Sequence, residues 1–210
     1  MRRKPNLASR IEKCAHFLVS NPCTLRGNWL AMYPHRQLYI EIGCGKGRFT
    51  TQTAKATPEA LIIGIEKTAN VLVIALERAE QDSLANVLFI NDLADDLDSF
   101  FAPGEVSRIY LNFSDPWPSN RHAKRRLTSQ GFLQAYKKIL APGGQIHMKT
   151  DNLPLLDFSL EQLISAGFEI TEETRHLHKD GPEEIMTDYE VKFYEQAVPI
   201  NKCIARISTY

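Results

Sequence analysis

Residues 37–47 read Gln-Leu-Tyr-Ile-Glu-Ile-Gly-Cys-Gly-Lys-Gly, an apolar run followed by three glycines at alternate positions. The apolar run is typical of a strand buried on both faces, and the glycines allow a sharp turn and the close approach of a ligand. Helix-like sequence follows from Arg48, so the loop joins a strand to a helix. Nucleotide-like ligands bind α/β sheets at such a turn, and the stretch therefore predicts an α/β protein with a ligand at this loop.

Short apolar runs alternate with helix-like segments along the rest of the chain, which is the pattern of an α/β protein with a parallel sheet. The expected parallel strands cover residues 37–42, 60–65, 87–91, 108–113 and 145–149. The expected helices cover residues 48–56, 68–83, 129–140 and 155–166. The tail is expected to add an antiparallel strand pair at 169–177 and 203–209. The prediction is a seven-stranded, mostly parallel sheet with helices on both faces and a turn, Pro142-Gly143-Gly144, before the fifth strand.

Length and composition favour a single soluble domain. The 210 residues, 43% of them hydrophobic, suffice for one core without disulfides or metals. No linker divides residues 1–210, within which we expect a basic N-terminal arm at 1–36, a cofactor-binding core at 37–152 and a C-terminal part at 153–210 that completes the substrate site. The four cysteines have no CxxC spacing, so we expect reduced thiols. The longest apolar stretch near the N-terminus, 15–19, is too short for a signal sequence or a span, and we expect a cytoplasmic location.

The net charge of zero, from 25 basic and 25 acidic residues, hides a strong asymmetry along the chain. Residues 1–36 hold seven Lys or Arg and one acid, and residues 121–138 hold six Lys or Arg and no acid. The remainder is therefore acidic. If the two basic segments meet on one face, that face can neutralise several phosphates; the alternative is that each run is an ordinary solvated helix face.

The glycine loop has the spacing GxGxG, because Arg48 stands where a dinucleotide-binding loop has its third glycine. This spacing argues against NAD. Glu66 ends the second expected strand, 23 residues after Gly43, where an acid can accept hydrogen bonds from ribose hydroxyls. Glu41, at the head of the loop, suits the ammonium of an amino-acid tail. A ligand with both groups is S-adenosylmethionine, whose adenine would lie near Asn91–Leu93; a solvated strand end is the plainer alternative for Glu66.

The segment Asp115-Pro-Trp-Pro-Ser-Asn-Arg-His-Ala-Lys-Arg-Arg126 follows the fourth expected strand. It combines a carboxylate, an aromatic ring between two prolines and four cations within six residues. A site for a flat, electron-rich group held on a polyanion needs these side chains. A tryptophan between prolines is more often structural, so we expect Trp117 to support the loop.

Four motifs resemble those of the bacterial tRNA (guanine-N7-)-methyltransferase (TrmB) family. They are Asp115-Pro-Trp-Pro118, Arg121-His-x-Lys-Arg-Arg126, Lys149-Thr-Asp-Asn152, and Thr187-Asp-Tyr-Glu190 with Lys192-Phe193. The resemblance covers nearly the whole chain, and the first two motifs together are highly specific. It implies a Rossmann-like class I methyltransferase fold, S-adenosyl-L-methionine as cofactor, and methyl transfer to N7 of guanine 46 in the variable loop of tRNA.

The resemblance and the glycine loop together imply a set of site residues. The expected cofactor site comprises Glu41, Gly43, Gly45, Gly47, Glu66, Asp92, Leu93 and Asp115. The resemblance implies contacts with the substrate guanine for Asp151, Thr187, Asp188, Tyr189 and Glu190. Two positions depart from the family. Ser119 stands where many members have a substrate-binding Lys; we expect Ser119 among the substrate-binding residues, with the role of that Lys passing to Arg121 or Lys124. On the adenine side, the acid of this chain is Asp92, whereas the family's Asp aligns with Leu93.

The proposed chemistry needs few groups. N7 of guanine carries a free lone pair, so its attack on the sulfonium methyl requires no general base. Catalysis then depends on positioning and on stabilising the positive charge that develops on the purine. We expect Asp115 to act as the catalytic residue, accepting from the N1 and N2 edge of guanine and offsetting this charge. The expected phosphate contacts are Arg121, Lys124, Arg125 and Arg126, with Arg2, Arg3, Lys4 and Arg10 as a flexible second clamp.

Several alternatives stay open from the sequence. Asp151 could form an Asx turn with Asn152, and residues 187–190 could be a helix cap and its first turn. His176 and His178 share an expected strand face, but two histidines without a third ligand are more often surface residues than a metal site. The competing functions are a methyltransferase for another substrate, a non-catalytic RNA-binding module and, more weakly, a dinucleotide oxidoreductase. The sequence allows either a monomer or a homodimer.

Overall fold

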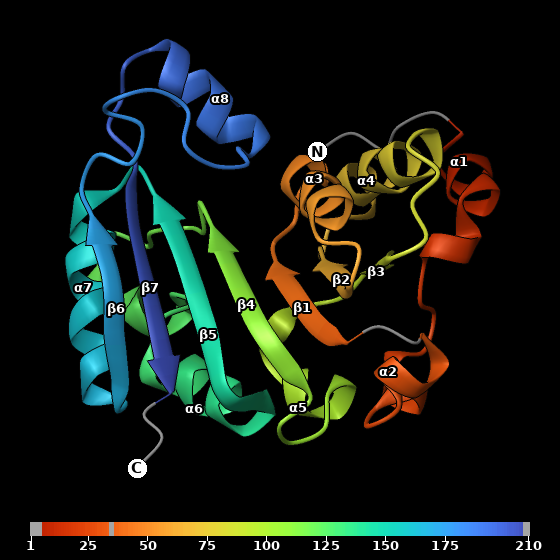
Figure 1. Cartoon of the computed structure of the whole chain (residues 1–210), viewed down its shortest axis with the longest axis horizontal. Coiled ribbons are helices and arrows are strands. Elements are labelled where there is room, and N and C mark those ends of the chain that lie inside the picture. Colours follow the sequence, from red (N-terminus) through yellow and green to blue (C-terminus); the bar gives the residue numbers. More distant parts are fainter. Residues whose placement is uncertain (1–5, 34–35, 208–210) are drawn as a thin grey trace.

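The computed structural model describes residues 6–33 and 36–207, and its strands form one sheet in the order β3-β2-β1-β4-β5-β7-β6 (Figure 1). The strands are β1 (Gln37–Ile42), β2 (Ala60–Ile65), β3 (Val87–Ile90), β4 (Val106–Asn112), β5 (Leu140–Thr150), β6 (Phe168–Thr174) and β7 (Asn201–Ile207). Strands β1 to β5 are parallel, whereas β7 is antiparallel to both of its neighbours. The predicted seven-stranded, mostly parallel sheet is confirmed.

Helices connect most of the strands. The α-helices are α1 (Leu7–Lys13), α2 (Trp29–Met32), α3 (Arg48–Ala56), α4 (Ala69–Gln81), α5 (Leu97–Phe100), α6 (Gln130–Ile139), α7 (Leu153–Ser165) and α8 (Asp188–Glu195). Short 3-10 helices are η1 (Ala15–Phe17), η2 (Pro22–Leu25), η3 (Ala94–Asp96) and η4 (Asn120–Arg125). The four predicted helices correspond to α3, α4, α6 and α7, with ends shifted by at most two residues.

Strand β2 is buried at every position, and its side chains alternate between two cores. Leu61, Ile63 and Ile65 pack with residues of α5, α6 and α7. Ala60 and Ile62 point the other way and pack with residues of α3 and α4. Helices therefore cover both faces of the sheet, as its run of branched apolar residues predicts (Figure 1).

Strand β5 begins five residues earlier than predicted. Leu140 pairs with Val106, and the register then shifts so that Gln145 pairs with Arg108. The additional residues of β5 form a bulge in which Gly143 has a φ angle of +74°. The Pro142-Gly143-Gly144 segment therefore bends the strand instead of preceding it.

The N-terminal segment is folded against the sheet over its described part. Leu18 forms a parallel bridge with Phe89 of β3. Trp29 is fully buried, and its indole Nε1 donates to the carbonyl of Phe100 over 2.9 Å. Packing of this kind holds the described part of the basic N-terminal arm against the sheet.

Arg10 was expected to belong to a flexible phosphate clamp, and the structure corrects this. Its guanidinium donates two hydrogen bonds of 2.6 Å to the Glu77 carboxylate on α4. The guanidinium charge that a phosphate would need is therefore already paired with a carboxylate in a bidentate ion pair. The other members of the expected clamp, Arg2, Arg3 and Lys4, lie outside the described residues.

Candidate functional site

Two adjoining cavities lie at the carboxyl ends of the central strands, where the glycine loop follows β1. The larger has a volume of about 500 Å³ and the smaller about 400 Å³. They share Gly43, Glu66, Asn112 and Phe113 as lining residues. The chain leaves β1 toward β2 on one side and returns to β4 on the other, so the cavities lie at the switch point of the sheet.

The glycine loop is fixed by contacts that explain two of its glycines. Gly43 has a φ angle of +77°, and its amide donates to the carbonyl of Ile65. Gly47 has a φ angle of +73°, and a Cβ at this position would lie only 2.4 Å from the Cβ of Ala75 on α4. Gly45, between these two glycines, donates a hydrogen bond from its amide to the Glu66 carboxylate. The loop can therefore bring α3 close to α4 while its backbone faces the smaller cavity.

Glu66 lies at the end of β2 and faces both cavities. Its carboxylate accepts from the amide of Gly45 over 3.2 Å and from the amide of Thr68 over 2.8 Å. These two bonds hold an acidic side chain at the position where the sequence predicts one, next to the glycine loop.

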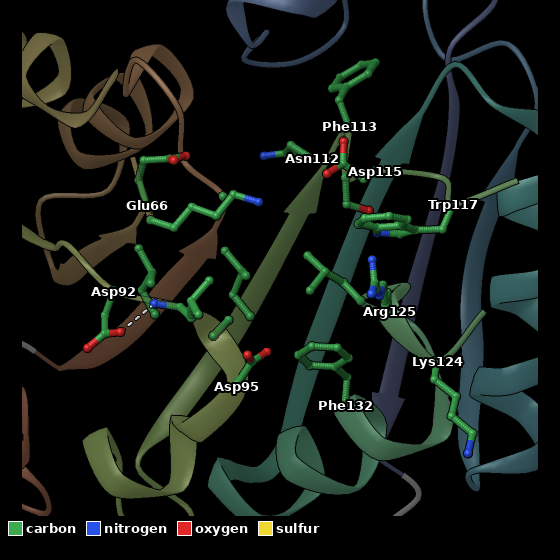
Figure 2. A pocket seen from close by; sticks show the side chains of 18 residues that line it. Glu66, Asp92, Asp95, Asn112, Phe113, Asp115, Trp117, Lys124, Arg125 and Phe132 are labelled. Carbon is green, nitrogen blue, oxygen red and sulfur yellow. Dashed lines mark hydrogen bonds between the residues drawn. The ribbon is translucent and has the colours of Figure 1, made fainter. Parts of the chain in front are cut away.

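Asp92 and Leu93 line the larger cavity beyond Glu66 (Figure 2). The Asp92 carboxylate accepts from the amide of Leu93 over 2.7 Å. Leu93 is about half exposed and supplies an apolar wall. Both residues therefore belong to the same cavity as Glu66.

Glu41 is 2% exposed at the end of β1 and lines the smaller cavity. Its carboxylate accepts from the hydroxyl of Thr50 and, over 2.9 Å, from the amide of Asn112. Burial raises the pKa of Glu41 to about 7, although these two hydrogen bonds and the charge of Lys149 lower it. Glu41 is therefore divided between its neutral and ionised forms near neutral pH.

Asp115 lies on the wall of the larger cavity, opposite Glu66 (Figure 2). It is exposed and stands between two non-glycine residues in the left-handed region, Phe113 with φ +52° and Trp117 with φ +42°. Trp117 lines the same cavity, and the guanidinium carbon of Arg125 lies 4.8 Å from its ring centroid. An exposed carboxylate, an aromatic ring and a cation therefore meet on one wall.

The four Lys and Arg side chains of residues 121–126, which are η4 and its C-cap, do not behave alike. Arg121, Lys124 and Arg125 are exposed, and the last two also line the larger cavity. Arg126 is only 9% exposed, and its guanidinium donates to the carbonyls of Pro116 and Trp117. The prediction that Arg126 contacts phosphate is therefore wrong for this structure, because the side chain is engaged beneath the loop.

Helix α8 forms the outer wall of the smaller cavity with Thr187, Asp188 and Tyr189. The Thr187 hydroxyl caps the helix in a capping box with Glu190. Asp188 accepts two hydrogen bonds, of 2.8 and 3.0 Å, from Arg78 on α4, so α8 is tied to the far side of the glycine loop. Tyr189 is 64% exposed and has its ring free for a ligand at the rim.

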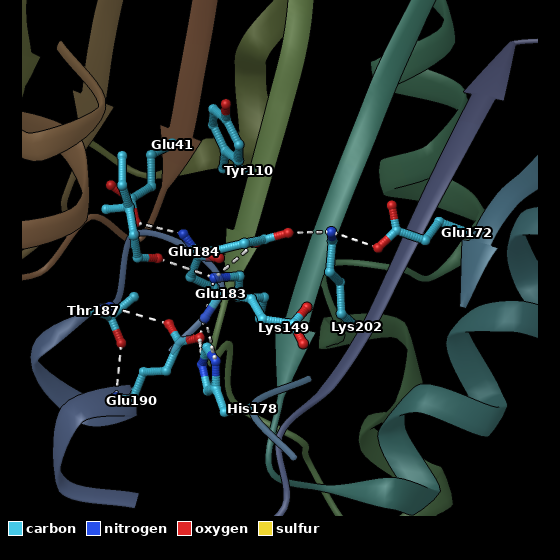
Figure 3. Close-up of polar contacts among 12 residues, drawn as sticks. Glu41, Tyr110, Lys149, Glu172, His178, Glu183, Glu184, Thr187, Glu190 and Lys202 are labelled. Atoms are coloured by element: carbon cyan, nitrogen blue, oxygen red, sulfur yellow. Dashed lines mark hydrogen bonds and ion pairs between the residues drawn. The ribbon is translucent and has the colours of Figure 1, made fainter. Parts of the chain in front are cut away.

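Glu190 is fully buried and does not line either cavity, which corrects its expected contact with guanine. Its Oε1 atom lies 3.0 Å from Nζ of Lys149 and 2.8 Å from Nε2 of His178 (Figure 3). Lys149 also donates to the carbonyl of Ile185 and pairs with Glu184. These contacts anchor the start of α8 to the end of β5.

The network continues to Lys202 on β7, which pairs with Glu184 and with Glu172 on β6 (Figure 3). His178 was expected on a strand surface, yet β6 ends at Thr174 and His178 is buried. His178 is buried beside the Glu190 carboxylate, and a carboxylate that is removed from water needs hydrogen-bond donors. Within residues 6–33 and 36–207, no three His, Cys, Asp or Glu side chains are grouped as metal ligands.

Two expected substrate residues, Asp151 and Ser119, are exposed and do not line these two cavities. The cap of α7 is formed by Asn152, whose side chain accepts from the amide of Leu155 over 2.9 Å. Asp151 is therefore not needed for this turn.

In the described part of the chain, no helix has the length and apolar character of a membrane span.

Sequence reasoning missed Asn112 and Phe132. Asn112 ends β4, lines both cavities and holds Glu41, and Phe132 of α6 lines the larger cavity. A polar residue that closes an apolar run, such as Asn112, is a signal that could have been used. Phe132 has no such signal, because a helical aromatic residue is more often in the core.

Solved methyltransferase structures share this fold. The 16S rRNA methyltransferase KamB matches with a TM-score of 0.65 at 12% identity, over 99% of this chain and 95% of that one. The antibiotic-resistance methyltransferase Kmr matches with a TM-score of 0.59 at 18% identity, over 85% and 91% of the two chains. The fold is that of the class I S-adenosylmethionine-dependent methyltransferases.

Sequence comparisons define the family within this class. Residues 35–203 match a family described as "Putative methyltransferase". The tRNA (guanine-N(7)-)-methyltransferase of Geobacillus kaustophilus (strain HTA426) is 46% identical over 207 residues, which cover 98% of this chain and 95% of that protein. The chain belongs to the bacterial tRNA (guanine-N7-)-methyltransferase family.

Proposed function

We propose that this protein transfers the methyl group of S-adenosyl-L-methionine to N7 of guanine 46 in the variable loop of tRNA. One observation carries the proposal: Glu66 and Asp115 lie on opposite walls of one cavity, and exposed cations lie at its rim. The chain is 46% identical to the Geobacillus enzyme over 98% of its length, and this similarity supports the same substrate. A tRNA-modifying enzyme of this kind would act in the cytoplasm.

The cofactor fits the pair of cavities by its chemistry. Glu66 would accept hydrogen bonds from ribose hydroxyls, and Glu41 would face an ammonium group beside the glycine loop. Asp92 and Leu93 would bound the adenine. When bound, the cofactor supplies an electrophilic sulfonium methyl group, and Glu41, Glu66 and the glycine loop would hold it in the two adjoining cavities, the larger of which Asp115 also lines.

Asp115 would act on the guanine. A carboxylate at the Watson–Crick edge accepts hydrogen bonds from N1 and N2 and favours the positive charge that methylation leaves on the purine. One unit charge at about 4 Å, with an effective dielectric constant of about 20, contributes roughly 4 kcal/mol. That value is an upper bound of about three decades in rate.

The substrate would enter between α8 and the Asp115 loop. Thr187, Asp188 and Tyr189 lie on one side, and Trp117 with Arg125 on the other. We assign the phosphates to the exposed cations of the η4 segment, Arg121, Lys124 and Arg125, with Asp151 and Ser119 at the outer edge of the substrate. A base in a folded tRNA must turn outward to reach a cavity of this kind.

The proposal is tested by incubating the protein with labelled cofactor and unmodified tRNA. The product is then cleaved with chemistry specific for N7-methylguanine, and the labelled position is mapped. We expect label at guanine 46 alone, and a tRNA whose position 46 is not guanine should remain unlabelled. Label at another atom, or on bulk protein or small molecules only, would contradict the assignment.

A further inference from the structure

Of the Lys and Arg side chains in residues 121–126, all of which the structure describes, Arg126 at the C-cap of η4 is the one that is buried. Its guanidinium lies beneath the loop Asp115-Pro-Trp-Pro118, which carries the proposed catalytic carboxylate. Nε donates to the Pro116 carbonyl over 3.0 Å and to the Trp117 carbonyl over 3.3 Å, and Nη2 donates to the Trp117 carbonyl over 3.0 Å. The side chain therefore binds the backbone on the carboxyl side of Asp115.

The planar guanidinium is also held from below. Its central carbon lies 4.3 Å from the ring centroid of Phe158 on α7. The ring orients the plane so that two of its N–H groups reach carbonyls, which is the fork geometry that a lysine ammonium does not reproduce. Arg126 thus connects the loop to α7.

The loop needs such a connection because its backbone is strained. Phe113 and Trp117 are bulky residues with φ angles of +52° and +42°. Each such conformation costs on the order of 1–3 kcal/mol and persists only where surrounding contacts enforce it. On the amino side, the Phe113 amide donates to the Lys149 carbonyl over 2.8 Å. On the carboxyl side, the hydrogen bonds from Arg126 do the same for Trp117.

We propose that Arg126 is a positioning residue that holds the strained loop and thereby directs Asp115 into the cavity, and that it does not contact tRNA phosphate. This inference rests on the proposed function for its catalytic readout. The exposed Arg121, in the same segment, supplies the contrast, because it has the same side chain but no such burial.

The test compares Arg121→Gln with Arg126→Gln, which remove the same charge at an exposed and at a buried position. Binding of tRNA is measured across a range of salt concentrations, and methyl transfer is measured at saturating tRNA. A lost phosphate contact lowers the slope of log affinity against log salt by about 0.7–0.9. We expect this change for Arg121→Gln and an unchanged slope for Arg126→Gln. For Arg126→Gln, kcat should fall by about 10- to 100-fold, the range that a displacement of about 1 Å produces.

A second variant and an activity-independent readout keep the test decisive. Arg126→Lys retains the charge and removes the fork, and we expect the same loss of kcat; if neither Arg126 variant folds, Phe158→Leu should lower kcat in the same direction with an unchanged slope. Acrylamide quenching of Trp117, identified with a Trp117→Phe control, should increase in the Arg126 variants even if the protein methylates another substrate. A reduced salt slope with normal kcat, or unchanged kcat and quenching, would overturn the proposal.

Discussion

Asp115 is exposed between two strained residues, and its position on the cavity wall determines what its removal should do. We expect Asp115→Asn to lower the rate of methyl transfer at saturating tRNA by up to about a thousandfold, because the developing charge on guanine loses its counter-charge. Asp95→Asn is the matched control, since Asp95 is an exposed carboxylate that lines the same cavity. A single-turnover assay measures both, and an Asp115 variant no slower than the Asp95 variant would contradict the role.

Glu41 shows how burial turns one side chain into a source of pH dependence. Its pKa is raised from 4.5 to about 7, first by burial, so the folded apo protein binds a proton that the unfolded chain releases. By linkage, this group's contribution to stability is fully present below about pH 4.5 and is lost as the pH rises through about 7. The difference corresponds to roughly 3 kcal/mol.

A glutamine at this position has no charge to bury. We therefore expect Glu41→Gln to raise the free energy of unfolding of the apo protein at pH 8, by up to the amount above, and to change it little at pH 5. Urea unfolding at the two pH values measures the effect. The same variant should bind S-adenosyl-L-methionine more weakly by calorimetry, because the cofactor's ammonium loses its acceptor. If Glu41→Gln were less stable than the wild type at pH 8, burial of the ionised Glu41 carboxylate would not be destabilising.

At the scale of elements, the glycine loop determines how closely α3 approaches α4. Gly43 and Gly47 have similar φ angles, of +77° and +73°, but only Gly47 has a neighbour in the way of a Cβ. We expect Gly47→Ala to be less stable than Gly43→Ala by about 1–3 kcal/mol, which is the cost of forcing extra volume into a packed contact. Thermal unfolding of the two apo variants measures the difference. Equal destabilisation would mean that only the backbone conformation matters.

The attachment of α8 depends on a buried ion pair between Lys149 and Glu190, with side chains 5% and 0% exposed. We expect Lys149→Met to destabilise the protein by about 3–5 kcal/mol, because it leaves a buried carboxylate without its cation. The double variant Lys149→Met/Glu190→Gln should recover part of this loss in a double-mutant cycle. Arg206→Met is the control, since its pair with Glu169 is about half exposed and should contribute about 1 kcal/mol or less. Independent, additive effects at 149 and 190 would contradict the coupling.

At the scale of the whole molecule, zero net charge coexists with exposed cations at the larger cavity. Three exposed cations of the η4 segment, Arg121, Lys124 and Arg125, should each release counterions from tRNA. We expect the affinity for tRNA to fall at least tenfold between about 50 and 200 mM salt. Filter binding over this range, with binding of S-adenosyl-L-methionine as the salt-tolerant control, measures the effect. An affinity for tRNA that does not change with salt would contradict the proposed phosphate contacts.

The fold was predictable from local patterns. Branched apolar runs of four to seven residues determine the central strands, and the glycine loop after β1 indicates the switch point. The bulge in β5 was not predictable, because it depends on pairing between Leu140 and Val106, which are far apart in the chain.

Many residues of the candidate site were named from the sequence, but Asn112 and Phe132 were missed, and Ser119, Asp151 and Glu190 do not line the two cavities. The division of roles among the residues was not predictable. Arg126 and Arg125 are neighbours of the same type, yet one is buried under the loop and the other lies over Trp117. Glu190 shares a motif with Tyr189, yet it points into the protein while Tyr189 is exposed. Adjacent residues of a helix or loop face different directions, and only the packed neighbours decide which direction is inward.

By itself, the sequence determined the class of sheet, the place of the glycine loop and the chemical types of the side chains around it, because these follow from periodicity and from motifs of adjacent residues. The tertiary structure alone decided which charges reach solvent. Arg10, Arg126, Lys149 and Glu190 are engaged by partners on other elements. Burial makes a charge seek a partner wherever the fold brings one near, and that proximity is set by the packing of the whole chain.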